Sequence, residues 1–168
     1  DVVERFPERR DLPWSDKVAD GAVIGARCHA LARLAAGEPC VVVASARSLL
    51  RCVPPASVRS AATDGSAFFS PVTFAVGPQE LLYRGYVNAG AADEPGTFHV
   101  HGDAIDVFPS QARSAVRLEF FGDEIDEIRR VVVSTGQTIG GQDKVTLYPC
   151  RELAVTPDAV KRCLRKNY

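Results

Sequence analysis

The sequence predicts an α/β protein in which a parallel α/β layer is interrupted by an antiparallel α+β insertion. Three observations carry this prediction. A short apolar strand pattern lies between two helical patterns near the N-terminus, closely spaced strand patterns fill the middle, and a strand followed by a helix returns at the end. The expected division is residues 1–67 for the first part of the layer, 68–143 for the insertion and 144–168 for the return to the layer.

The first part of the layer reads as helix, strand and helix. Asp20 can cap a helix whose apolar stripe recurs at helical spacing, and Arg27 lies off that stripe. The stretch CVVVAS, residues 40–45, is apolar and β-branched, which is typical of a strand covered on both faces. A second helix is expected from its N-cap, Ser45, to Leu50. The stripe of the first helix consists of Ile24, Cys28, Leu31 and Leu34.

The insertion changes from helical to alternating periodicity. SPVTFAV, residues 70–76, is a candidate strand, and a short helix is expected over 78–84. The later strands follow one another closely, so neighbours should be antiparallel, and residues 122–123 are typical of a two-residue hairpin turn. Gly102 interrupts the first of them and indicates a bend. These strands are expected at about 97–108, 115–121 and 124–133.

The last part returns to the first pattern. Residues 145–148 read as a strand. Thr156 followed by Pro157 is typical of the start of a helix, which we expect to run to about Arg165. Basic residues in its last turn complement the helix dipole.

Composition and charge argue against several functions. The 168 residues carry 20 basic and 21 acidic side chains, a balance that gives no electrostatic reason to expect tight binding of nucleic acid or of a membrane surface. No apolar run approaches the roughly 18 residues that a membrane helix requires. The P-loop pattern G-x-x-x-x-G-K-[ST] is absent from the sequence, so we expect no nucleotide cradle and no cofactor in this chain.

The cysteines indicate the redox compartment of the chain, and the absence of methionine indicates that it is part of a longer protein. Five cysteines, an odd number without a C-x-x-C pair, suit a reducing cytoplasm better than a disulfide framework. The sequence contains no methionine, not even at position 1, and we expect it to be an excised piece of a longer protein.

Side-chain parity in the strand AVRLEFF separates two faces. Alternate residues of a strand point to opposite sides, so Val116, Leu118 and Phe120 should face the core. The other side then carries three residues of mixed chemistry: Arg117, Glu119 and Phe121. Phenylalanine beside arginine on a wet face is typical of a partner-binding hot spot. A loop or helix that covers Phe121, or a twist of the hairpin that turns it inward, is the alternative.

The preceding strand pattern allows a different chemistry. His99 and His101 alternate, so they point the same way and could share a metal ion, with Asp103 as an oxygen ligand. A small metal-dependent hydrolase built on these three residues is therefore a competing hypothesis. Catalytic zinc usually takes three protein ligands, and the neighbourhood offers no third confident one, which weighs against it.

Three segments carry a resemblance to a known family. GTFHVHGDAIDVFP (96–109), VRLEFFGDEIDEIR (116–129) and VTLYPCREL (145–153) resemble the UvrB-like module of bacterial nucleotide excision repair. The match is closer to the transcription-repair coupling factors (Mfd) than to UvrB. This resemblance implies a partial RecA-like lobe without a P-loop, interrupted by an inserted domain that binds UvrA. A fragment of UvrB itself is an alternative, because a truncated UvrB would also lack its P-loop.

The resemblance also assigns residues to the contact with UvrA. The family's strand arginine falls on Arg117 and its second phenylalanine falls on Phe121. His101 stands where the family has arginine, so this chain departs from the pattern there. Glu119 lies between Arg117 and Phe121 on the same predicted face and completes the expected site.

For the rest of the protein, the resemblance implies functions outside this chain. RNA polymerase and DNA would bind other domains of the full protein, which would be an ATP-dependent DNA translocase. The present chain would be a non-catalytic, cytoplasmic adaptor with no membrane contact. Direct DNA contact by this chain is not expected, because its charge is balanced and it shows no aromatic-basic groove.

Overall fold

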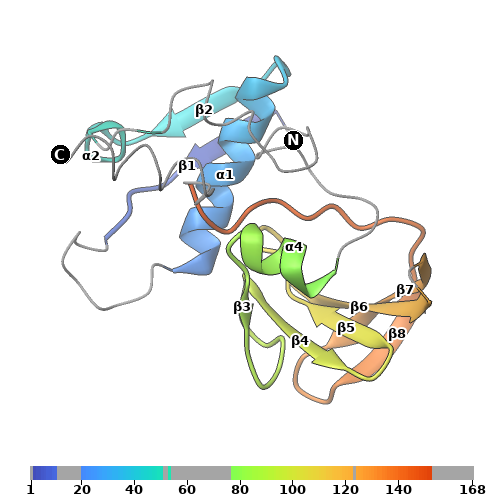
Figure 1. Ribbon diagram of the computed structural model, residues 1–168. Coiled ribbons are helices and arrows are strands. Elements are labelled where there is room, and N and C mark those ends of the chain that lie inside the picture. The colour runs from blue at the N-terminus through green and yellow to red at the C-terminus, as the bar shows by residue number, and fades with distance from the viewer. Residues whose placement is uncertain (1, 11–19, 51–52, 54–76, 123, 153–168) are drawn as a thin grey trace, which may run out of the picture.

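The computed structural model describes residues 2–10, 20–50, 53, 77–122 and 124–152 (Figure 1). These residues form two sheets. The smaller sheet pairs β1, Val3–Phe6, with β2, Val41–Ala44, in parallel, and the larger sheet has six strands in the order β3-β4-β5-β6-β7-β8. The protein is therefore a mixed α/β structure whose main sheet is mostly antiparallel. The candidate strand 70–76 and the C-terminal helix from Thr156 lie outside the described residues.

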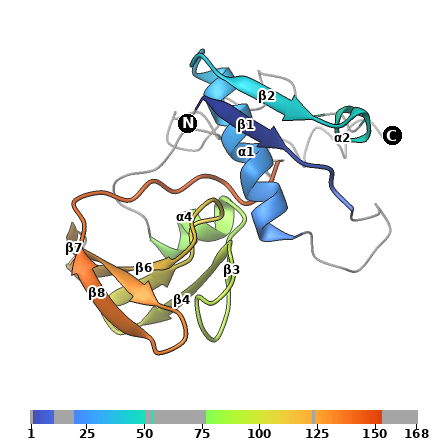
Figure 2. The ribbon, with the colours of Figure 1, turned by 180° about the vertical axis from the view of Figure 1, so that it is seen from behind.

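Helix α1, Gly21–Ala35, begins where the sequence predicts and packs on the small sheet (Figures 1 and 2). The Asp20 carboxylate accepts hydrogen bonds from the backbone N–H groups of Ala22 and Val23, which caps the helix. Helix α2, Ala46–Leu49, follows β2 and is capped by Ser45, again as predicted. In the described part of the chain, no helix has the length and apolar character that a membrane span requires.

The outer face of the small sheet carries exposed valines. Val41 and Val43 of β2 are 55% and 58% exposed, and Val3, which pairs with Val41, is exposed as well. The prediction that CVVVAS is covered on both faces is therefore wrong within the described residues. Helix α1 packs on one side only, and the apolar character of the strand does not reveal which side a helix will cover.

The large sheet forms its own core. Strand β3, Val87–Asn88, runs parallel to β4, and the other neighbours are antiparallel. Helix α4, Pro78–Tyr83, lies beside the sheet and buries Leu81 against it (Figure 1). The remaining strands are β4, Thr97–His101; β5, Ala104–Val107; β6, Ala115–Phe121; β7, Glu124–Val132; and β8, Gln137–Gly141.

The single strand predicted over 97–108 is two strands. His101 pairs with Ala104, which leaves Gly102 and Asp103 as a two-residue hairpin turn between β4 and β5. Gly102 has φ +57°, a backbone conformation that glycine adopts without strain, so the chain reverses there instead of bending. Val100 pairs with Ile105 on the core side of the sheet, and it is 37% exposed next to this turn.

The segment after β8 was predicted to contain a strand over 145–148, and that prediction is wrong. Leu147 makes an isolated bridge, and the rest is extended chain that runs back from the large sheet to α1 (Figure 2). The Cys150 backbone N–H donates to the Arg84 carbonyl at 2.8 Å, and the Tyr86 hydroxyl donates to the Tyr148 carbonyl at 2.9 Å. These two contacts fasten the end of the segment beside the end of α4.

Arg27, which the helical pattern placed off the apolar stripe, is completely buried. Its guanidinium lies 3.9 Å from the centre of the Phe6 ring, and Nη1 donates to the Pro7 carbonyl at 2.8 Å. Its Nε donates to Glu152 in the segment after β8, and Glu152 is also buried. An ion pair between residues 125 positions apart therefore joins α1 to this segment.

Candidate functional site

The face of the large sheet opposite its core carries charged side chains from four strands. Asp106 of β5 stands between His99 of β4 and Arg117 of β6, and Arg117 stands opposite Arg129 of β7. Two residues further along β6, Glu119 stands opposite Glu127 of β7. We call this set the polar face, and it consists of His99, His101, Asp106, Arg117, Glu119, Phe121, Glu127 and Arg129.

Arg117 and Asp106 form a bidentate pair at the centre of the polar face. Arg117 Nε and Nη2 donate to the two oxygens of Asp106 at 2.7 and 2.8 Å. His101 Nε2 lies 3.1 Å from Asp106 Oδ2. Burial alone would raise the pKa of Asp106, but the hydrogen bonds from Arg117 and the nearby His101 ring, together with the charges of both, lower it below its usual value.

A second group of charges lies beside this pair. Arg129 donates to Glu127, and its Nε lies 3.8 Å from a Glu119 oxygen. All three side chains are well exposed, so water screens these pairs and each contributes little to stability. Together they place two carboxylates and one guanidinium side by side across β6 and β7.

Phe121 is the apolar member of the polar face, and it is 84% exposed. It ends β6 opposite Glu124, next to the hairpin turn at Gly122, as the sequence predicts. Within the described residues, neither a covering element nor an inward twist hides the ring, so the alternative to exposure is wrong there. Phe120, its neighbour, packs against the core on the other side of the sheet, which confirms the parity of this strand.

The structure brings together three of the four residues predicted for a partner site and places the fourth at the edge. His101 on β4 and Arg117 and Glu119 on β6 lie on one face of the sheet with β5 between them, and Phe121 follows at the end of β6. Asp106, which links Arg117 to His101, was missed. The sequence could have predicted the position of Asp106. If Gly102 is assigned to a two-residue hairpin turn and not to a bend, Asp106 falls on the same face of the sheet as His101.

The residues of the metal hypothesis do not converge on a common point. His99 Nδ1 lies 2.8 Å from the Ala89 carbonyl oxygen, and the His99 and His101 rings stack with centres 5.7 Å apart. Asp103 sits in the turn and lines a hollow formed with core-side residues of the sheet. Among the residues that the structure describes, no group of three or more His, Cys, Asp or Glu could hold a metal ion.

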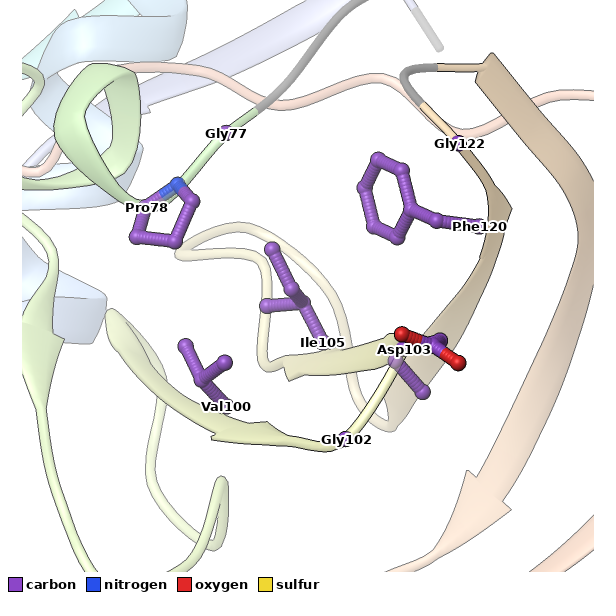
Figure 3. Close-up of a pocket in the computed structure, with 9 residues that line it drawn as sticks. Gly77, Pro78, Val100, Gly102, Asp103, Ile105, Phe120 and Gly122 are labelled. Atoms are coloured by element: carbon purple, nitrogen blue, oxygen red, sulfur yellow. The ribbon is translucent and has the colours of Figure 1, made fainter.

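That hollow has a volume of about 440 Å³ and lies between the β4–β5 turn and the start of α4 (Figure 3). Side chains of Ile105, Phe120 and Pro78 surround it, with Val100 at its rim (Figure 3). Polar and apolar groups both line it, and Asp103 is the one titratable residue among the described residues of its lining. A lone carboxyl group without a base or nucleophile beside it gives this hollow no evident chemistry.

The lowered pKa of Asp106 predicts how stability depends on pH. Because the folded state depresses this pKa, Asp106 stabilises the fold above the pKa of the unfolded chain, about 3.9. That contribution is lost as the pH falls through the lower pKa of the folded state. We expect wild type to unfold at a higher temperature than Asp106→Asn at pH 7, and the difference to shrink below about pH 4. Thermal unfolding of both proteins from pH 7 to pH 2.5 measures this, and a difference that does not change with pH would contradict it.

The fold and the polar face can now be compared with known proteins. Residues 75–153 match the family of the UvrB interaction domain. The chain is 34% identical over 162 residues, 95% of its length, to a transcription-repair-coupling factor from Myxococcus xanthus. It is 28% identical over 165 residues, 96% of its length, to a protein of the same name from Bacillus subtilis. The chain spans only 13% and 14% of these two relatives.

The similarity to UvrB is shorter. The chain is 42% identical over 71 residues to the UvrABC system protein B of Clostridium botulinum, which covers 42% of the chain and 11% of that protein. Similarity to the coupling factors instead runs along almost the whole chain. Residues 75–153 therefore match the UvrB interaction domain, and the chain as a whole matches a UvrB-like module of the transcription-repair coupling factors.

Proposed function

We propose that this chain is a non-catalytic adaptor that recruits UvrA through the polar face of its large sheet. The observation that carries this proposal is Phe121, an aromatic ring that is 84% exposed at the edge of a face of charged groups that are paired with one another. When a partner buries an exposed aromatic ring, the free energy of the complex falls. Aromatic and arginine side chains are enriched among the residues that contribute most to binding free energy.

The other groups of the polar face support binding over catalysis. Arg117 and Asp106 neutralise each other, and Arg129 is held by Glu127. His101 has a carboxylate beside it, but none of the residues that make up the polar face is serine, threonine or cysteine. A histidine–aspartate pair without a nucleophilic side chain beside it lacks the group that covalent catalysis requires.

The rest of the proposal concerns the longer protein. The small parallel sheet and α1 would belong to a RecA-like lobe that holds no nucleotide and needs no cofactor. Other domains of a coupling factor would bind RNA polymerase and DNA and would use ATP for translocation. This module would then bring UvrA to a stalled polymerase in the bacterial cytoplasm.

A titration with UvrA tests the adaptor function, with Arg117→Glu as the variant. Reversal of this charge removes the bidentate pair and places two carboxylates side by side, so we expect UvrA affinity to fall at least about tenfold. Arg130→Glu is the matched control, because Arg130 is an exposed arginine of β7 that points to the other side of the sheet. Equal affinities of Arg117→Glu and wild type, or no UvrA binding by wild type, would contradict the proposal.

A further inference from the structure

Asp106 is the point at which side chains of three strands meet on the polar face. It lies on β5, between His101 of β4 and Arg117 of β6, and contacts both. Its side chain is only 14% exposed, whereas those of His101 and Arg117 are 37% and 23% exposed. The carboxylate is thus the shielded group, and the two groups that it holds are open to a partner.

The geometry restricts Arg117 far more than a single contact would. Two parallel hydrogen bonds, at 2.7 and 2.8 Å, fix the plane of the guanidinium and occupy its Nε and Nη2 donors. Arginine has five N–H donors, so those on Nη1 stay available. Arg117 makes no other hydrogen bond among the described residues, so Asp106 sets the orientation of its side chain.

Arginine otherwise loses considerable rotamer freedom when a partner binds it. A carboxylate that already orders the side chain removes part of that loss before binding. We infer that Asp106 is a positioning residue of the polar face, which presets Arg117, and with it His101, for the partner. This inference rests on the proposed binding of UvrA. It assigns a role in that binding to Asp106, which need not touch UvrA itself.

The expected effect is moderate and depends on Arg117. Ordering one long side chain costs about 0.5–1.5 kcal/mol, so Asp106→Ala should weaken UvrA binding about 2- to 13-fold. In an Arg117→Ala background, the same replacement should have little further effect, because the side chain that Asp106 positions is gone. Asp106→Glu retains the charge and should recover part of the affinity, whereas Asp106→Asn should not.

A double-mutant cycle on the intact chain tests this. UvrA affinity is measured for wild type, Asp106→Ala, Arg117→Ala and the double variant, with thermal unfolding of each as a check on folding. Asp143→Ala is the control, because Asp143 is an exposed carboxylate after β8 and outside the polar face. An equal loss of affinity from Asp106→Ala in both backgrounds would overturn the inference, as would no loss in wild type.

The same measurements separate this inference from the proposed function. If wild type and Asp143→Ala both fail to bind UvrA, the proposed function is wrong and the inference falls with it. If wild type binds and Arg117→Ala weakens binding but Asp106→Ala does not, only the inference is wrong. The NMR signal of Arg117 Nε–H gives a reading without UvrA, and it should be protected from solvent exchange in wild type and lose that protection in Asp106→Ala.

Discussion

Phe121→Ala is expected to weaken UvrA binding at least about 30-fold, which corresponds to a loss of about 2 kcal/mol. The ring is the largest apolar group on the polar face, and it is 84% exposed in the free chain. Replacing the ring by alanine therefore removes apolar surface that is exposed in the free chain and would be buried only in the complex with UvrA. Because the ring makes little contact within the chain, the unfolding temperature should hardly change. Calorimetric titration with UvrA, together with thermal unfolding, measures both quantities.

Ile139→Ala is the matched control for this prediction. Ile139 of β8 is 53% exposed and pairs with Arg130, which faces away from the polar face. It should therefore bind UvrA as wild type does. Phe121→Trp retains a large ring and should keep most of the affinity. A Phe121→Ala protein that binds as tightly as wild type would remove the main support for the proposed docking site.

Arg27→Met is expected to lower the free energy of unfolding by about 3–5 kcal/mol. The replacement retains much of the side-chain volume but leaves Glu152 as a buried carboxylate with Arg9, 3.3 Å away, as its remaining described ion-pair partner. The contact with the Phe6 ring and the hydrogen bond to the Pro7 carbonyl are lost as well. Urea unfolding followed by fluorescence or circular dichroism measures the change.

A double variant shows whether the uncompensated charge causes the loss. In Arg27→Met/Glu152→Gln the carboxylate is gone, so we expect a substantial part of the stability to return even if the single variant does not fold. Arg47→Met is the control, because Arg47 forms an exposed pair with Glu8 that should be worth less than about 1 kcal/mol. If Arg27→Met and Arg47→Met lose equally little stability, the buried pair does not stabilise the junction between α1 and the segment after β8.

The sequence predicts the strand that carries the polar face because apolar and polar side chains of β6 alternate from Val116 to Glu119. Val116 and Leu118 are buried, and Phe121 is exposed, as their positions require. The turn after it is short, so β7 has to follow as the antiparallel neighbour. Local pattern and local turn chemistry therefore suffice to place Arg117, Glu119 and Phe121 on one face.

Where distant residues decide, the sequence predicts less. Arg27 looks like a surface residue of α1 because its partner, Glu152, lies 125 positions away. Residues 145–148 are apolar enough for a strand, but apart from the bridge at Leu147 no neighbouring chain continues the pairing in the described residues. Strand β8 contains two glycines in QTIGG, which disfavour a strand locally, and its pairing with β7 forms it instead.

The contact between Cys150 and Arg84 has a consequence for how such a module can be inherited. The chain passes through residue 84 before it forms the large sheet and returns to residue 150 after it, and a 2.8 Å hydrogen bond joins the two positions. A segment whose ends meet can be inserted into, or removed from, a host protein at one site without redirecting the rest of the chain. This closed loop includes most of residues 75–153, the stretch that matches the UvrB interaction domain. Proteins that otherwise differ can thus carry this unit as a single inserted domain.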